Sequence, residues 1–326
     1  MIDLLLDCKI LLTYPLAYRK RYKLDLEHMP TTKLKELLES GKKRLDLLLL
    51  GDSVTERVAR DDQDQRTLFE MLRDLLPEGA DFYHICHSAY YADIYLAYLR
   101  QLLNLGIRPD MVILPVNLRS FSPQWDYNPM FQNTVHLTQL LESLPQREKA
   151  IIGVSLAKKN LWQYLNAEVE YIGSGLNRMR HFLRIVAHKP KNSREAAQRR
   201  GDIFTFHYMN KVDGRHRKIA VLSEITRLCT THGIGLLAYF TPINYQCACK
   251  YLGEGFRDNL KINVRTISEG ILAKLNGIGD QIRILDFSTL FSPDYFFNAE
   301  ETTEHLAEQG RLELCREILA NLHVRN

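Results

Sequence analysis

A serine that follows a short apolar run is the residue of this chain best suited to chemistry. The run Leu45–Leu50 is closed by Gly51-Asp52-Ser53. Its length and its branched apolar side chains predict a buried parallel strand that ends in a tight turn. Open α/β sheets bind their ligands beside the carboxyl ends of such strands. Ser53 could therefore act as a nucleophile, with nearby backbone N–H groups to stabilise a developing negative charge. The alternative is a serine that only caps the helix beginning near Val54.

Three further segments carry groups that could serve a nucleophilic serine. His87-Ser88-Ala89-Tyr90 follows a predicted strand, and a backbone N–H at Ser88 or Ala89 could donate to an oxyanion. Asn117 follows the next predicted strand, and its side-chain amide could donate in the same way. His305 precedes the last predicted helix, where it could take the proton of the serine and later return it. The structural alternatives are a plain turn at 87–90, a capping Asn117, and a surface or capping His305.

Strand-like and helix-like segments alternate along much of the chain, which predicts an α/β fold with a parallel sheet wrapped by helices. The predicted strands cover 45–50, 81–86, 111–116, 234–240 and 282–287. The predicted helices cover 67–76, 92–105, 221–231, 258–275 and 308–322. Residues 1–44 are expected to form a helical extension, with a helix at about 33–40, and 45–326 the α/β domain. Few strand-like runs occur at about 119–218, which predicts a helical insertion there.

The ordered set of segments resembles the SGNH, or GDSL-type, hydrolase superfamily. Gly51-Asp52-Ser53 matches the nucleophile block of that family, and residues 109–117 resemble the block that ends in Asn. His305-Leu306, followed by Gly310 and an amphipathic helix, resembles the terminal block. The resemblance covers about 45–118 and 219–322 and leaves the middle of the chain unexplained.

This resemblance implies a three-layer α/β/α sandwich with a mainly parallel, flavodoxin-like sheet, and a serine-centred esterase or acyl-transfer activity. It assigns Ser53 as the nucleophile and His305 as the base. It builds the oxyanion hole from the Ser53 N–H, a backbone N–H at Ser88 or Ala89, and the Asn117 side chain. We expect neither a cofactor nor a metal.

The chain departs from the family pattern in three places. Thr302 stands where the family has an Asp three residues before the His, and Ser88-Ala89 and Pro115 stand where it has glycines. A hydroxyl cannot stabilise an imidazolium as a carboxylate does, and loss of the triad acid can cost up to about 10⁴ in rate. Glu301 is the candidate for the missing acid; a Ser–His dyad oriented by a backbone carbonyl is the alternative. The other acids in reach along the chain are Asp294, Glu300 and Glu304.

Arg119 and Trp125 follow Asn117, where a ligand wall would lie, and could hold a sugar or an acidic group. The alternative is a loop anchored by one buried aromatic residue. The expected function is a serine esterase or O-acyltransferase that forms an acyl-Ser53 intermediate, with an O-acylated carbohydrate as substrate. The competing hypothesis is a non-catalytic SGNH-fold protein with an incomplete triad that binds a glycan or a partner.

Charge gives no strong indication of a nucleic-acid partner. The formal net charge is +4, although residues 178–218 hold twelve Lys and Arg against three acids. Such a stretch could meet nucleic acid or an anionic glycan. It lacks a recognisable recognition module, so a solvated helical surface is the favoured interpretation.

Cysteine usage and the amino-terminal sequence favour a cytoplasmic protein. The six cysteines have no CxxC spacing, which favours free thiols over a metal site. The first residues lack the order of a signal peptide, and no run of about 18 apolar residues occurs. The first 20 residues could touch a membrane surface, although packing against the main domain is favoured. Nothing in the sequence indicates an oligomeric state.

Overall fold

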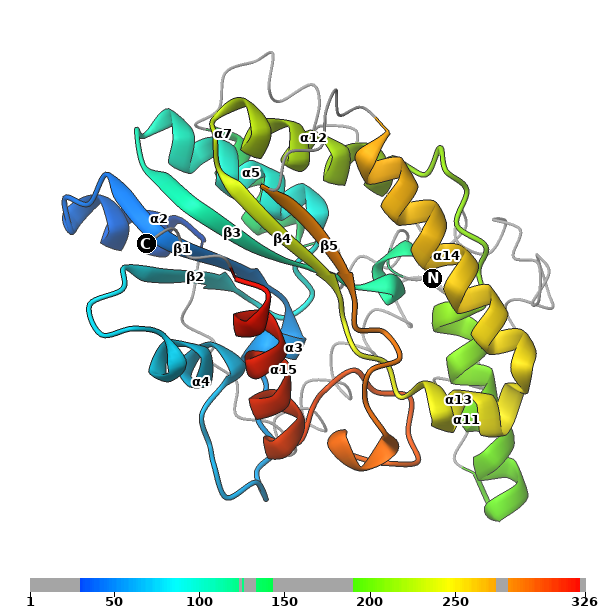
Figure 1. Ribbon diagram of the computed structural model, residues 1–326. Coiled ribbons are helices and arrows are strands. Elements are labelled where there is room, and N and C mark those ends of the chain that lie inside the picture. The colour runs from blue at the N-terminus through cyan, green and yellow to red at the C-terminus, as the bar shows by residue number, and fades with distance from the viewer. Residues whose placement is uncertain (1–29, 123–124, 126–132, 143–189, 274–280, 323–326) are drawn as a thin grey trace, which may run out of the picture.

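A five-stranded parallel sheet forms the centre of the molecule (Figure 1). The computed structural model describes residues 30–122, 125, 133–142, 190–273 and 281–322. The strands are β1 (Arg44–Gly51), β2 (Phe82–Cys86), β3 (Arg108–Val116), β4 (Gly235–Phe240) and β5 (Ile282–Asp286). Their order is β2-β1-β3-β4-β5, and every neighbouring pair is parallel. This is the flavodoxin-like strand order, so the expected fold class is confirmed.

The central strands bury side chains on both faces of the sheet. In β1, Leu48 and Leu50 belong to one apolar cluster, whereas Leu47 and Leu49 belong to the other. Successive side chains of a strand point to opposite faces. A run of leucines without polar interruption therefore needs a helix layer on each side of the sheet.

Helices cover both faces (Figure 1). The larger cluster joins the sheet to α5 (Ala92–Asn104), α7 (Thr134–Glu142), α12 (Arg217–Thr231) and α14 (Glu254–Leu272). The smaller cluster joins the opposite face to α4 (Leu68–Leu75) and α15 (Glu308–Ala320). The result is the three-layer α/β/α sandwich.

The end of the basic stretch at 178–218 lies inside this helix layer. Arg217 of α12 donates to both carboxylate oxygens of Asp93 in α5, one of them at 2.9 Å, and Asp93 is fully buried. Lys218 is buried as well, and its Nζ donates to the carbonyl oxygen of Ser120. The predicted solvated surface is therefore wrong for Lys218, which is buried; Arg217 is partly exposed, and both cations fasten α12 to its neighbours.

The remaining elements of the described residues are short or peripheral: α2 (Pro30–Glu39), α3 (Ser53–Glu56), η1 (Leu118–Phe121), α11 (Ser193–Tyr208), α13 (Tyr245–Leu252) and η4 (Pro293–Tyr295). Sequence patterns did not predict α13. β3 begins at Arg108, earlier than expected, and Pro109 lies within it opposite Leu45. Proline is tolerated at the start of a strand because a ladder hydrogen bond there is dispensable.

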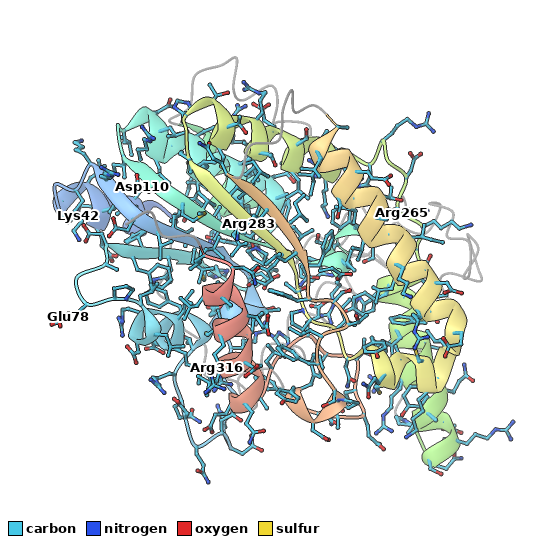
Figure 2. All side chains as sticks on the ribbon, in the orientation of Figure 1. Lys42, Glu78, Asp110, Arg265, Arg283 and Arg316 are labelled. Atoms are coloured by element: carbon cyan, nitrogen blue, oxygen red, sulfur yellow. The ribbon has the colours of Figure 1, made fainter. Side chains whose placement is uncertain are left out.

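The expected domain division stays a prediction. Within 119–218, the described parts form helices (η1, α7 and α11), while 143–189 lie outside the described residues. The predicted membrane contact of the first 20 residues also lies outside them. No helix of the described residues is long and apolar enough to cross a membrane. Figure 2 shows charged side chains, among them Lys42, Glu78 and Arg265, on the outside of the molecule.

Candidate active site

The turn after β1 holds Ser53 at the carboxyl edge of the sheet. Gly51 ends the strand so close to its neighbours that a Cβ there would lie 2.1 Å from Thr55 Oγ1 and 2.6 Å from Cys86 Sγ. Asp52 caps the single turn of α3, because its Oδ1 accepts the Val54 N–H at 2.8 Å. Ser53 is the first residue of that turn. It follows the strand that lies between β2 and β3, where the strand order reverses and where such sheets bind ligands.

His305 lies on a loop that is fastened at several points. Phe296 and Leu306 form an antiparallel bridge, and the Phe297 N–H donates to the His305 carbonyl at 3.0 Å. The buried side chain of Asn244 donates to two loop carbonyls, those of Ala299 at 3.0 Å and Glu301 at 3.2 Å. These bonds fix the backbone of the loop and therefore the position from which the imidazole projects.

The structure brings Ser53 and His305 together. Their Oγ and Nε2 atoms are 3.1 Å apart, although the residues are 252 positions apart in the chain. Arg57 Nη1 approaches the same Nε2 atom at 3.3 Å. A guanidinium can only donate hydrogen bonds, so Nε2 must be the acceptor and the neutral ring carries its proton on Nδ1. This is the tautomer that can take a proton from the Ser53 hydroxyl.

The Thr303 hydroxyl faces the other ring nitrogen of His305. Thr303 Oγ1 lies 3.4 Å from His305 Nδ1 and also accepts the His305 N–H at 3.0 Å. From the sequence we expected Glu301 at this position and overlooked Thr303. The overlooked signal is local, because a Thr hydroxyl commonly accepts the backbone N–H two residues on. The acid role of Glu301 stays a prediction; its carbonyl oxygen accepts from Asn244.

The environment of His305 disfavours its charged form. Burial lowers the pKa of His305 well below its ordinary value of 6.5, and the positive charges of Arg57 and Arg119 lower it further. The imidazole is therefore neutral at physiological pH. The same environment makes an imidazolium costly.

Two buried carboxylates meet beside this pair, bridged by Asn117. The Asn117 Nδ2 donates to Asp52 Oδ2 at 3.0 Å and to Glu304 Oε2 at 2.9 Å. Burial, and then the charge of Glu304, raise the pKa of Asp52 to about 6. The hydroxyl of Tyr208, which comes from α11, donates to Glu304 Oε1. Glu304 thus ties the His-bearing loop both to the end of β3 and to the insertion.

This network changes what we expect of three predicted site residues. Both amide hydrogens of Asn117 have carboxylate acceptors, so Asn117 can serve an oxyanion only if one of these bonds breaks. Arg119 Nε lies 3.5 Å from Glu304 Oε1, which makes it part of the buried cluster. Trp125 is buried, and its backbone N–H donates to the Ser122 carbonyl at 3.0 Å. Substrate binding by Arg119 and Trp125 stays a prediction.

Ala89 has a backbone conformation that favours glycine. Its φ is +64°, in the left-handed region that residues with a Cβ seldom adopt. The Asn133 Nδ2 donates to the Ala89 carbonyl at 2.9 Å and helps to hold this turn. Within the described residues, the backbone N–H groups of Ser53 and Ala89 donate to no other group. Both are therefore candidates for an oxyanion hole.

A metal site is not apparent in the described part of the chain, where no group of three or more His, Cys, Asp or Glu could hold an ion. Neither a family model nor a curated protein matches this chain. Among solved structures, the chain is similar to a GDSL-like lipase from Bacteroides thetaiotaomicron VPI-5482. The match has 10% identity and a TM-score of 0.37, and covers 90% of this chain and 96% of the other. At this identity and TM-score the similarity carries no residue role or activity to this chain.

The strand order of the sheet defines the fold. A parallel sheet in the order β2-β1-β3-β4-β5, covered by helices on both faces, is a flavodoxin-like three-layer α/β/α sandwich.

Proposed function

We propose that this protein is a serine hydrolase or acyltransferase that acts on esters through an acyl-Ser53 intermediate. The observation that carries the proposal is the 3.1 Å approach of Ser53 Oγ to His305 Nε2, with Nε2 identified as the acceptor by Arg57. A nucleophile and a base at hydrogen-bond distance are the minimum arrangement for this chemistry.

In the proposed reaction, Ser53 Oγ attacks the carbonyl carbon while its proton passes to His305 Nε2. The N–H groups of Ser53 and Ala89 donate to the oxyanion that forms. His305 returns the proton to the departing alcohol, and water or a second hydroxyl then releases the acyl group. Thr303 holds the ring in the required tautomer through Nδ1. An O-acylated carbohydrate is the substrate that we favour.

The second candidate is a non-catalytic binding protein of the same fold. The observation that favours it is the Asn117 amide, whose two hydrogens already bond to the carboxylates of Asp52 and Glu304 instead of being free for an oxyanion. The two candidates differ in the reactivity of Ser53.

Labelling with a fluorophosphonate probe separates them. We expect the wild-type chain to be labelled, and Ser53→Ala and His305→Ala to lose the label. Ser40→Ala, at an exposed serine just after α2, is the matched control and should label as the wild type does. A wild-type chain that resists labelling would reject the enzyme and favour the binding protein.

A further inference from the structure

Two hydrogen-bond donors compete for the Nε2 atom of His305. Ser53 Oγ lies at 3.1 Å and Arg57 Nη1 at 3.3 Å, and a neutral imidazole nitrogen has one lone pair to share between them. The single turn of α3 builds this contact into the fold, because the Arg57 N–H donates to the Ser53 carbonyl at 3.1 Å. The guanidinium is buried, so solvent does little to screen it.

The second arm of Arg57 is held from the other side. Arg57 Nη2 donates to Ser88 Oγ at 3.1 Å, and Ser88 Oγ donates in turn to Glu56 Oε2 at 2.8 Å. The chain Glu56–Ser88–Arg57 keeps the guanidinium beside the reacting pair even when Nη1 leaves Nε2.

Arg57 in this position opposes the transfer of a proton from Ser53. Once Nε2 is protonated it becomes a donor. The imidazolium of His305 and the guanidinium of Arg57 would then face each other with N–H groups, at the 3.3 Å that now separates Nη1 from Nε2. The lowered pKa of His305 has Arg57 as its first cause after burial. A base in this state is weak until something draws the guanidinium away from Nε2.

We propose that the substrate carries an oxyacid group, a carboxylate, sulfate or phosphate, near its ester. On binding, this group accepts hydrogen bonds from the Arg57 guanidinium in place of His305 Nε2. The inference rests on the proposed function and specifies the class of its substrate. The planar fork of an arginine fits the two oxygens of such a group, and the anion balances the cation beside the imidazole. Nε2 is then released to Ser53. The proton moves from Oγ to Nε2, the Oγ–carbon bond forms, and the bond to the alcohol oxygen breaks as that oxygen receives the proton.

Matched esters test this inference. One pair is 4-nitrophenyl butyrate and mono-4-nitrophenyl succinate, which places the charge on the acyl side. The other pair is 3-acetoxybenzamide and 3-acetoxybenzoate, which places it on the alcohol side. We expect the wild-type chain to prefer the anionic member of at least one pair by about 10-fold or more in kcat/KM.

Arg57→Gln should lose this preference and hydrolyse the neutral ester several-fold faster than the wild type does, because the guanidinium no longer competes for Nε2 and its charge no longer opposes the imidazolium. A merely structural role for Arg57 would slow both esters alike. Arg60→Gln removes an exposed arginine three residues further on and should keep the wild-type preference. Arg57→Lys keeps the charge without the planar fork and should reduce the preference, which provides a second variant if Arg57→Gln fails to fold.

The outcomes separate this inference from the proposed function. If the fluorophosphonate labels Ser53 but the wild type hydrolyses both members of each pair equally, the inference is overturned and the enzyme stands. The same conclusion follows if Arg57→Gln slows both esters in equal measure, or if the preference of Arg57→Lys equals that of the wild type. A chain that does not label at all overturns the proposed function and the inference with it.

Discussion

At the scale of single residues, two neighbours contact the two ring nitrogens of His305. Arg57 donates to Nε2 and its charge disfavours the imidazolium, whereas the neutral Thr303 hydroxyl lies at hydrogen-bond distance from Nδ1. A carboxylate opposite Nδ1 would instead stabilise the imidazolium that forms during proton transfer. Thr303, being neutral, does not itself provide such electrostatic support.

Replacing Thr303 by Asp should supply that support. An Asp oxygen can still accept the His305 N–H as Thr303 does, so we expect the loop to keep its conformation. The pKa of His305 should rise, and ester hydrolysis should increase by about 10-fold, a fraction of the ~10⁴ that a triad acid can be worth. NMR titration of the imidazole and the pH dependence of kcat/KM measure the two effects.

Thr303→Asn is the matched control, since it has the shape of Asp without the charge. Equal pKa values for His305 in the Asp and Asn variants would show that the group at this position does not act on the imidazole.

At the scale of elements, the turn between β1 and α3 is the part that positions Ser53. Its geometry depends on the absence of a side chain at Gly51, since Thr55 and Cys86 occupy the space where a Cβ would lie. The Asp52 cap then starts α3 so that Ser53 is its first residue.

Gly51→Ala should lower the free energy of unfolding by about 1–3 kcal/mol, the usual cost of an overpacked core position. It should also slow fluorophosphonate labelling, because either α3 or β2 must shift. Gly255→Ala in α14 meets no atom within 4 Å and should be neutral or stabilise by up to about 1 kcal/mol. Denaturant unfolding compares the two variants; a Gly51→Ala protein as stable as Gly255→Ala would mean that the turn adapts without cost.

At the scale of the whole molecule, the buried acids at the sheet edge make stability depend on pH. The pKa of Asp52 is raised from 3.8 to about 6 in the folded chain. Between these values the unfolded chain releases the proton that the folded chain retains, so the contribution of Asp52 to stability is present below about pH 4 and is lost as pH rises through 6. His305 acts in the opposite direction, because its lowered pKa reduces stability as pH falls below 6.5.

The contribution of Asp52 can be isolated by a difference between variants. Relative to the wild type, Asp52→Asn should gain roughly 2–3 kcal/mol in free energy of unfolding as pH rises from 4 to 7, since about two pKa units are involved. The effect of His305 is present in both chains and cancels. Thr55→Ser, an uncharged change in the same turn, should differ from the wild type by an amount independent of pH. A flat difference for Asp52→Asn would contradict a raised pKa at this position.

The sequence alone determined most of the strands and helices and the order of the residues at the sheet edge. Leucines on both faces of β1 required two helix layers, and the apolar periods of α4, α5 and α12 located these helices, because such patterns arise from local geometry. Residue type and position also pointed to Ser53 and His305. The helix α13 and the early start of β3 were not predicted, since their local patterns are weak.

The tertiary structure decided which side chains share a partner. Only the folded chain engages Asn117 with Asp52 and Glu304, places Arg57 on His305 Nε2, and turns the Thr303 hydroxyl towards Nδ1. A hydrogen bond depends on angles and on a few tenths of an ångström, and these are set by packing between segments distant in the chain. Residue type and spacing therefore predicted which edge of the sheet holds the candidate site. Packing determines the protonation states of Asp52 and His305 at that edge.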